Sequence, residues 1–181
     1  MHESAAFCNL TIAMNQFTII ALVCACIVLG GCRSSGPSEP APLPNMFPSL
    51  EAMAEGVVEA IQDSSLERLQ SFCLTEQEYS EILWANLPEQ EVRNMPVEKA
   101  WGWVKRDVEK ASRRYIDDFG NHQLKIVKLT SPQEVRSYPN IKVHRAFRIT
   151  VSDRGAEPEE WRLINVILEY KGWFKVIAYN D

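Results

Sequence analysis

Histidine and cysteine are scarce in this chain, and with them the usual parts of a metal or redox centre. The 181 residues include three histidines and five cysteines, and none of these stands at the spacing of a metal site. No glycine-rich phosphate loop, nucleophile elbow or sugar-cleaving carboxylate motif occurs either. We therefore expect no cofactor, no metal and no catalytic residue that a motif can identify.

An excess of positive charge is also lacking. Acidic residues number 24 against 19 lysines and arginines, which gives a formal net charge of -5. Proteins that bind nucleic acid need a basic surface to neutralise phosphates, and no long basic block offers one here. We therefore exclude nucleic acid as a partner.

No lysine or arginine precedes Arg33, and residues 17–29 form an apolar run without any charge. The run has the length of the hydrophobic region of a signal peptide and is shorter than the ~20 residues that a membrane-spanning helix needs. The missing basic residues depart from the signal-peptide pattern, whether the start is Met1 or Met14. A generic secretory signal or a short uncleaved anchor is the alternative interpretation.

Leu29, Gly30, Gly31 and Cys32 close this run, and they resemble the lipobox of bacterial lipoprotein precursors. The resemblance implies a signal peptide at 1–31, a lipid on the Cys32 sulfur and a cell-envelope location. Because the residue after Cys32 is not aspartate, we expect the periplasmic face of the outer membrane if the host has one. In the cleaved chain the second cysteine is Cys73, whose apolar neighbours predict a buried side chain.

The part of the chain after the apolar run divides into two. Residues 32–48 contain five prolines, a composition that favours an extended spacer over a packed core. Residues 49–181 have the length of one domain. We therefore predict a lipidated spacer at 32–48 that carries a single domain at 49–181.

Helix signals dominate the first half of the predicted domain. Ser49 precedes an apolar stripe at helical spacing, and Ser64 and Thr75 are each followed three positions later by the glutamate of a capping box. A longer amphipathic helix is predicted over 96–118, and Gly120 suits a left-handed C-cap.

Lysines and arginines gather on the side of the long helix that lies opposite its apolar stripe. Such a face can meet anionic phospholipid or an acidic partner, but acidic residues are interleaved with it. We therefore interpret it as a solvated helix face. The basic residues are Lys99, Lys105, Arg106, Lys110, Arg113 and Arg114, and the acidic ones are Glu98, Asp107 and Glu109.

The hydrophobic period changes from helical to alternating after the long helix, as in half-buried β-strands. Arg145 falls on the otherwise apolar side of one such strand, where an unpaired charge would be costly. His144 falls on the polar side and is expected to be exposed. The predicted strands cover 123–129, 141–151, 161–170 and 173–179.

The last two predicted strands form a hairpin. Lys171 and Gly172 are a two-residue turn signal that pairs Tyr170 with Trp173. Both faces of the hairpin are largely apolar, with Lys175 as an exception. Helices followed by antiparallel strands predict an α+β fold in which N-terminal helices pack on a curved antiparallel sheet.

Residues 58–69, the long helix and residues 170–177 resemble the SnoaL-like or nuclear-transport-factor-like family, whose cone-type fold is also called cystatin-like. The resemblance covers residues 49–181. It implies either a site inside the cone, as in isomerases, dehydratases and cyclases, or a binding domain without one.

A pocket inside such a cone would need apolar walls and a few polar groups. Arg145 needs an acid, a carbonyl or an anionic ligand if it is buried, and a structural ion pair is the alternative for it. The tyrosines can line the pocket or belong to the core with their hydroxyls at its rim. The candidate pocket residues are Trp101, Tyr115, Arg145, Tyr170 and Tyr179.

We expect a non-catalytic domain, held to the membrane through Cys32, that binds a partner protein or a small apolar ligand in the envelope. A small pocket enzyme of the isomerase, cyclase or dehydratase type is the alternative, and a structural accessory of a larger envelope assembly is a third. A buried histidine or aspartate at a cavity would favour the enzyme. A cone filled by Trp101, Phe147 and Leu168 would exclude it.

Overall fold

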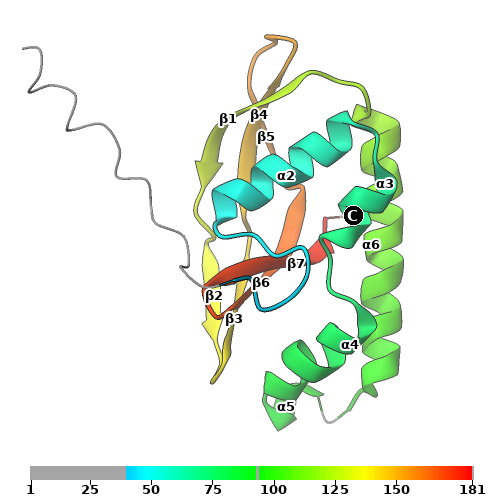
Figure 1. Ribbon diagram of the computed structural model, residues 1–181, viewed down its shortest axis with the longest axis vertical. Coiled ribbons are helices and arrows are strands. Elements are labelled where there is room, and N and C mark those ends of the chain that lie inside the picture. The colour runs from blue at the N-terminus through cyan, green and yellow to red at the C-terminus, as the bar shows by residue number, and fades with distance from the viewer. Residues whose placement is uncertain (1–39, 93, 181) are drawn as a thin grey trace, which may run out of the picture. The chain divides into compact units, whose positions relative to one another are not determined.

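The computed structural model describes residues 40–92 and 94–180 of the chain (Figure 1). The predicted signal peptide, Cys32 and the first part of the spacer lie outside the described residues. Helices come first and two antiparallel sheets follow in an open arrangement, so the predicted α+β class is confirmed. The helices are α2 (Leu50–Gln62), α3 (Leu66–Ser71), α4 (Glu76–Glu78), the π-helix η1 (Tyr79–Leu83), the 3-10 helix η2 (Trp84–Asn86), α5 (Glu89–Val92) and α6 (Val97–Phe119).

Two of the three predicted helix starts before α6 are confirmed. Ser49 caps α2 by accepting a hydrogen bond from the Ala52 N–H, and Thr75 caps α4 in a capping box. α3 begins one residue later than predicted, because Ser65 is its cap. Ser64 instead takes a left-handed φ of 50°, which turns the chain between α2 and α3.

The predicted left-handed cap at Gly120 is wrong by one residue. Gly120 has a φ of -59°, and the left-handed residue is Asn121 with a φ of 63°. Glycine is needed at position 120 for a different reason. A Cβ there would lie 2.4 Å from the Ile116 carbonyl oxygen and 2.6 Å from the Ser64 hydroxyl.

The described strands form two antiparallel sheets. One has the order β1-β4-β5 and the other the order β2-β3-β6-β7. Strand β2 is exposed along its whole length and was not predicted from the sequence. The strands are β1 (Leu124–Thr130), β2 (Glu134–Ser137), β3 (Ile141–Arg145), β4 (Arg148–Asp153), β5 (Glu159–Trp161), β6 (Ile164–Tyr170) and β7 (Trp173–Tyr179).

The single strand predicted over 141–151 is two strands in different sheets. The chain breaks between them at Ala146, which has a left-handed φ of 56°. The predicted alternation continues across the break, because Ile141 and Val143 are buried before it and Phe147 is buried after it, but Arg145 is exposed at the end of β3. Arg145 is therefore not the buried charge that its place in the alternation suggested. Its partner in the β2–β3 register is Glu134.

The predicted β6–β7 hairpin and its register are confirmed. Tyr170 pairs with Trp173, and the turn residues Lys171 and Gly172 have φ values of 53° and 79°, as a type I′ turn requires. Register shifts beside Val166 make β6 irregular near its start. Side chains of β7 belong to both clusters of core residues.

Residues 44–47, which we call the edge strap, pack against the free edge of β7. Phe47 and Phe174 exchange two backbone hydrogen bonds of 2.8 Å, and Met46 is buried. The segment after α3 covers the same edge further along, where the Leu74 N–H bonds to the Val176 carbonyl. The packed region therefore begins before Ser49, and the edge strap is not spacer.

The interior is filled by side chains from both the helices and the sheets. α2 packs on β1 and β7, and α6 runs beside α3 (Figure 1). Phe147 and Leu168 are almost completely buried, in two different core clusters, and Trp101 packs against the second. Within residues 40–92 and 94–180, no helix is long and apolar enough to span a membrane.

Candidate functional site

A cleft of about 390 Å³ lies between the α4–η1 turn and the beginning of α6. We call it the Trp101 cleft. One wall comes from α4 and η1, and the other from α6. Its lining residues are Glu76, Gln77, Ser80, Glu81, Val97, Glu98 and Trp101.

Trp101 is the aromatic residue that lines the Trp101 cleft, and other aromatic rings pack behind it. The Trp101 ring packs at 5.4 Å from the ring of Tyr79, which packs in turn at 6.0 Å from Trp84. Tyr79 is buried, and burial raises the pKa of its phenol, so its hydroxyl stays neutral. Trp101 is half-buried, which leaves part of its ring available to a ligand.

The rim of the Trp101 cleft is acidic. Glu76, Glu81 and Glu98 line it and are exposed. The Gln77 side-chain amide donates to both carboxylate oxygens of Glu81, at 3.1 and 3.3 Å, and so orients that carboxylate. An aromatic surface beside carboxylates is suited to a positively charged group.

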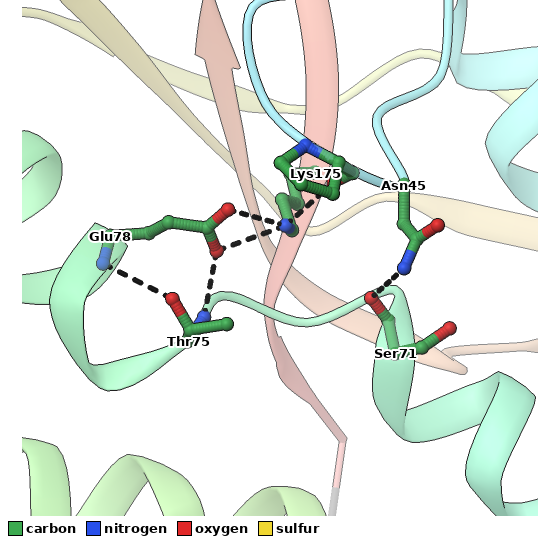
Figure 2. Close-up of polar contacts among 6 residues, drawn as sticks. Asn45, Ser71, Thr75, Glu78 and Lys175 are labelled. Carbon is green, nitrogen blue, oxygen red and sulfur yellow. Dashed lines mark hydrogen bonds and ion pairs between the residues drawn. The ribbon is translucent and has the colours of Figure 1, made fainter.

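A buried ion pair attaches the α4–η1 wall to β7 (Figure 2). The Lys175 ammonium is 2.8 Å from Glu78 Oε1, 2.9 Å from Glu78 Oε2 and 2.8 Å from the Pro44 carbonyl oxygen. Lys175 is 1% exposed and Glu78 is 8% exposed. All three donors of the ammonium therefore have acceptors, as a buried charge requires.

Glu78 also completes the predicted capping box. Its Oε2 accepts a hydrogen bond of 2.8 Å from the Thr75 N–H, and the Thr75 hydroxyl accepts one of 3.2 Å from the Glu78 N–H. Nearby, the Asn45 amide donates to the Ser71 carbonyl at 3.2 Å (Figure 2). The Glu78–Lys175 pair thus links the start of α4, strand β7 and the edge strap.

The wall that Glu78 fixes continues into a π-helix. Tyr79–Leu83 forms η1, a conformation that is rare and often found at functional sites. Ser80 and Glu81, both in η1, face the Trp101 cleft. The sequence predicted the helix start at Thr75 but gave no signal for the π-turn.

A second cleft, of about 260 Å³, lies at the other end of α6, and we call it the His122 cleft. His122 Nδ1 is 2.9 Å from Asp153 Oδ2, and Asp153 Oδ1 accepts a hydrogen bond from the Gln123 N–H. The Phe119 and Trp161 rings lie 4.3 Å apart beside them. The lining residues are Phe119, His122, Val151, Asp153, Ala156, Glu157, Glu159 and Trp161.

His144 is buried, so the prediction that it is exposed is wrong. Its Nε2 lies 2.8 Å from Glu169 Oε2, and the Lys142 ammonium lies 2.8 Å from Glu169 Oε1. Burial alone would raise the pKa of Glu169, but the hydrogen bonds from Lys142 and His144 outweigh it and lower that pKa. The arrangement is an ion-pair cluster on β3 and β6.

The five candidate pocket residues are not brought together in one pocket. Trp101 lines the Trp101 cleft, and Arg145 is exposed on β3. Tyr170 lines a small surface cleft beside the hairpin turn. Tyr115 and Tyr179 are buried with their rings 6.0 Å apart, and their hydroxyls donate to the carbonyls of Leu163 and Leu69.

Cys73 is buried, as the sequence predicted. Burial raises the pKa of its thiol to about 12, so the thiolate that a nucleophile needs does not form near neutral pH. Across the described part of the chain, no group of histidine, cysteine, aspartate and glutamate side chains could hold a metal ion.

No protein-family model, curated protein or solved structure matches this chain. The lipobox and the cone-type domain stay predictions from the sequence. The chemistry of the clefts is therefore argued from their own residues.

Proposed function

We propose that the chain is a cell-envelope lipoprotein, held to the membrane by a lipid on Cys32, whose α+β domain binds a basic segment of a partner protein. The observation that carries the binding role is the Trp101 cleft, in which the Trp101 ring lies beside three glutamates. A wholly apolar ligand would strip water from those carboxylates without replacing it, which is costly. A lysine or arginine side chain satisfies both surfaces.

The expected interaction has two parts. A cation over the Trp101 ring contributes about 0.5–2 kcal/mol, depending on how much water is excluded. Hydrogen bonds from the same cation to Glu81 or Glu98 add orientation, and arginine is favoured because its planar group can engage ring and carboxylate together. We therefore place arginine ahead of lysine as the ligand side chain.

The rigidity of the α4–η1 wall supports this role. Glu78 is fixed by Lys175 and by the capping box, so Ser80 and Glu81 are held in place before a ligand arrives. A site that is ordered in advance loses less conformational entropy on binding.

Calorimetric titration of the full chain with a tetra-arginine peptide tests the proposed site, with a tetraglutamine peptide as the blank. We expect saturable binding of the arginine peptide, about tenfold weaker in Trp101→Leu and in Glu81→Gln with Glu98→Gln. Matched controls are Trp103→Leu, on the other face of α6, and Glu55→Gln with Glu67→Gln. Equal binding by the cleft variants and their controls would contradict the proposal.

The lipid anchor has its own test. Cys32→Ala should release the protein from the membrane fraction of the native host or stall its processing, because the lipid attaches to that sulfur. Unchanged processing and unchanged membrane association would refute the lipobox interpretation and leave the binding site untouched.

The filled interior counts against an enzyme site inside a cone, but the His122 cleft, outside that interior, favours a pocket enzyme as a second candidate function. A carboxylate that holds His122 Nδ1 at 2.9 Å leaves Nε2 as a general base beside an aromatic surface. The elimination reaction of 5-nitrobenzisoxazole, a neutral aromatic probe for general bases, should be faster with the wild-type protein than in buffer alone. With His122→Gln the rate should fall back to that of buffer. A rate equal to that of buffer in the wild type rejects this candidate.

A further inference from the structure

The outward face of α6 carries a regular row of basic residues around one tryptophan. Positions 99, 103, 106, 110 and 113 follow one another in steps of four and three, so they share one side of the helix. All five side chains are exposed, whereas Val108, Ala111 and Tyr115 are buried on the opposite side. We call this row the α6 stripe, and its residues are Lys99, Trp103, Arg106, Lys110 and Arg113.

Three acidic residues of the same helix flank the α6 stripe, and a fourth, Asp117, continues its line one turn beyond Arg113. At 100° per residue, Asp107 and Glu109 fall roughly 80° to either side of its centre, and Glu98 falls roughly 100° away. Asp107 meets Arg106 from the side, at 3.6 Å. The sequence suggested a mixed, solvated face, but the helix geometry separates the basic row at positions 99–113 from its acidic flanks and leaves Asp117 at its C-terminal end.

Trp103 makes the α6 stripe more than a row of charges. Its side chain is 44% exposed, an unusual state for a residue of this size. The Lys99 ammonium lies 5.6 Å from the centre of its ring. Tryptophan flanked by lysine and arginine is the combination found where a helix rests on the interface of a lipid bilayer.

We propose that the α6 stripe docks on an anionic phospholipid surface. The four cations span 14 residue steps, roughly 21 Å of helix, so they can meet several headgroups at once while Trp103 enters the interface. The partner is chosen by charge complementarity and by the exposed indole together. The net charge of -5 opposes contact with such a surface through the acidic parts of the chain.

The docking site is separate from the Trp101 cleft. Trp101 lies on the opposite side of α6 from Trp103, roughly 160° around the helix. A ligand in the cleft and a bilayer against the α6 stripe are therefore compatible. The proposal stands whether or not the cleft binds basic segments.

Tryptophan quenching by brominated lipids tests the docking in the full chain. The protein is mixed with brominated phosphatidylcholine vesicles, with or without phosphatidylglycerol, and the Trp103 signal is the difference between wild type and Trp103→Phe. The vesicles without phosphatidylglycerol measure any attachment by the apolar run at 17–29. We expect quenching of the Trp103 signal to appear with phosphatidylglycerol and to fall at high salt.

Charge variants then assign the docking to the α6 stripe. Each cation near an anionic surface is worth roughly a fivefold change in affinity, so Lys99→Gln, Arg106→Gln and Arg113→Gln together should raise the half-saturating lipid concentration about a hundredfold. The matched control, Lys125→Gln with Lys128→Gln and Arg162→Gln, removes the same charge from other exposed positions and should behave as the wild type. Thermal unfolding confirms that all variants fold.

Three results would overturn the proposal. They are no quenching of Trp103 with phosphatidylglycerol, equal quenching without it, and equal lipid dependence in the stripe and control variants. The first would leave an acidic protein as the remaining kind of partner for this face.

Discussion

Two of the groups of ion pairs that join neighbouring elements differ in burial, because one lies in the interior of the domain and the other on its surface. Lys175 and Glu78 join β7 to α4 and are almost fully buried. Arg68 joins α3 to α2 through Glu59 at 2.8 Å and Asp63 at 3.0 Å, with all three side chains more than 40% exposed. The distances are similar, but water reaches only the second group.

The difference in water access should decide what each group contributes to stability. In the interior, removal of one partner strands the other as an uncompensated charge, which typically costs 3–5 kcal/mol. On the surface, water replaces a lost partner, and such pairs contribute about 0–1 kcal/mol. The interior group therefore acts as a structural requirement, and the surface group is nearly dispensable.

Lys175→Met should have the largest effect. The substitution leaves the Glu78 carboxylate and the Pro44 carbonyl without their buried donor, so we expect the free energy of unfolding to fall by about 3–5 kcal/mol. Urea unfolding followed by circular dichroism measures it. Lys128→Met on exposed β1 is the matched control, with a change below about 0.5 kcal/mol. A similar small loss in both variants would remove the distinction between the two groups.

Adding Glu78→Gln to Lys175→Met should recover most of that loss. Glutamine is uncharged and can still accept the hydrogen bond from the Thr75 N–H, as in other capping boxes. We expect the double variant to be about 1 kcal/mol less stable than the wild type, because an amide buried without a full set of partners still costs something. If the double variant is as unstable as Lys175→Met alone, the stranded charge is not the cause.

Glu169 is intermediate in burial between the interior group and the surface group, and its contribution to stability depends on pH. Its pKa is lowered in the folded state from the ordinary value of 4.5. Its stabilising effect is therefore present above about pH 4.5 and is lost as the pH falls through the folded-state pKa. Glu169→Gln should lower stability by about 1 kcal/mol near neutral pH and by less in acid. Unfolding curves at both pH values give the two differences, and an equal loss at each would count against the role of the carboxylate charge.

Local signals explain which parts of the fold could be predicted from the sequence. The caps at Ser49 and Thr75 and the turn at Lys171 and Gly172 depend on neighbouring residues, and the structure has all of them. The break at Ala146 was missed because a left-handed alanine has no composition signal. Because β3 was not expected to end at Arg145, the sequence did not show that this side chain is exposed.

Parts of the candidate site could not be predicted because they depend on contacts between residues that are distant in sequence. Glu78 and Lys175 are 97 positions apart, so the lysine looked like an interruption in an apolar strand. His144 was predicted to be exposed for the same reason, because its partner Glu169 belongs to another strand. Trp101 was predicted to line a pocket because it is a large aromatic residue on a helix with a strong hydrophobic period, and it lines the Trp101 cleft. Whether such a residue faces a cleft or solvent depends on the packing around the helix, as Trp101 and Trp103 show.

Arg68→Met should have the smallest effect, because the methionine stem can still pack near the Phe72 ring, and the losses are two exposed ion pairs and a cation–π contact at 5.9 Å. We expect a loss of about 0.5 kcal/mol at low salt, and less in high salt, since exposed pairs are screened. Urea unfolding at two salt concentrations measures both values, with Lys175→Met as the insensitive reference. A loss above about 2 kcal/mol, or one that salt does not change, would mean that the α2–α3 junction depends on Arg68 as the interior depends on Lys175.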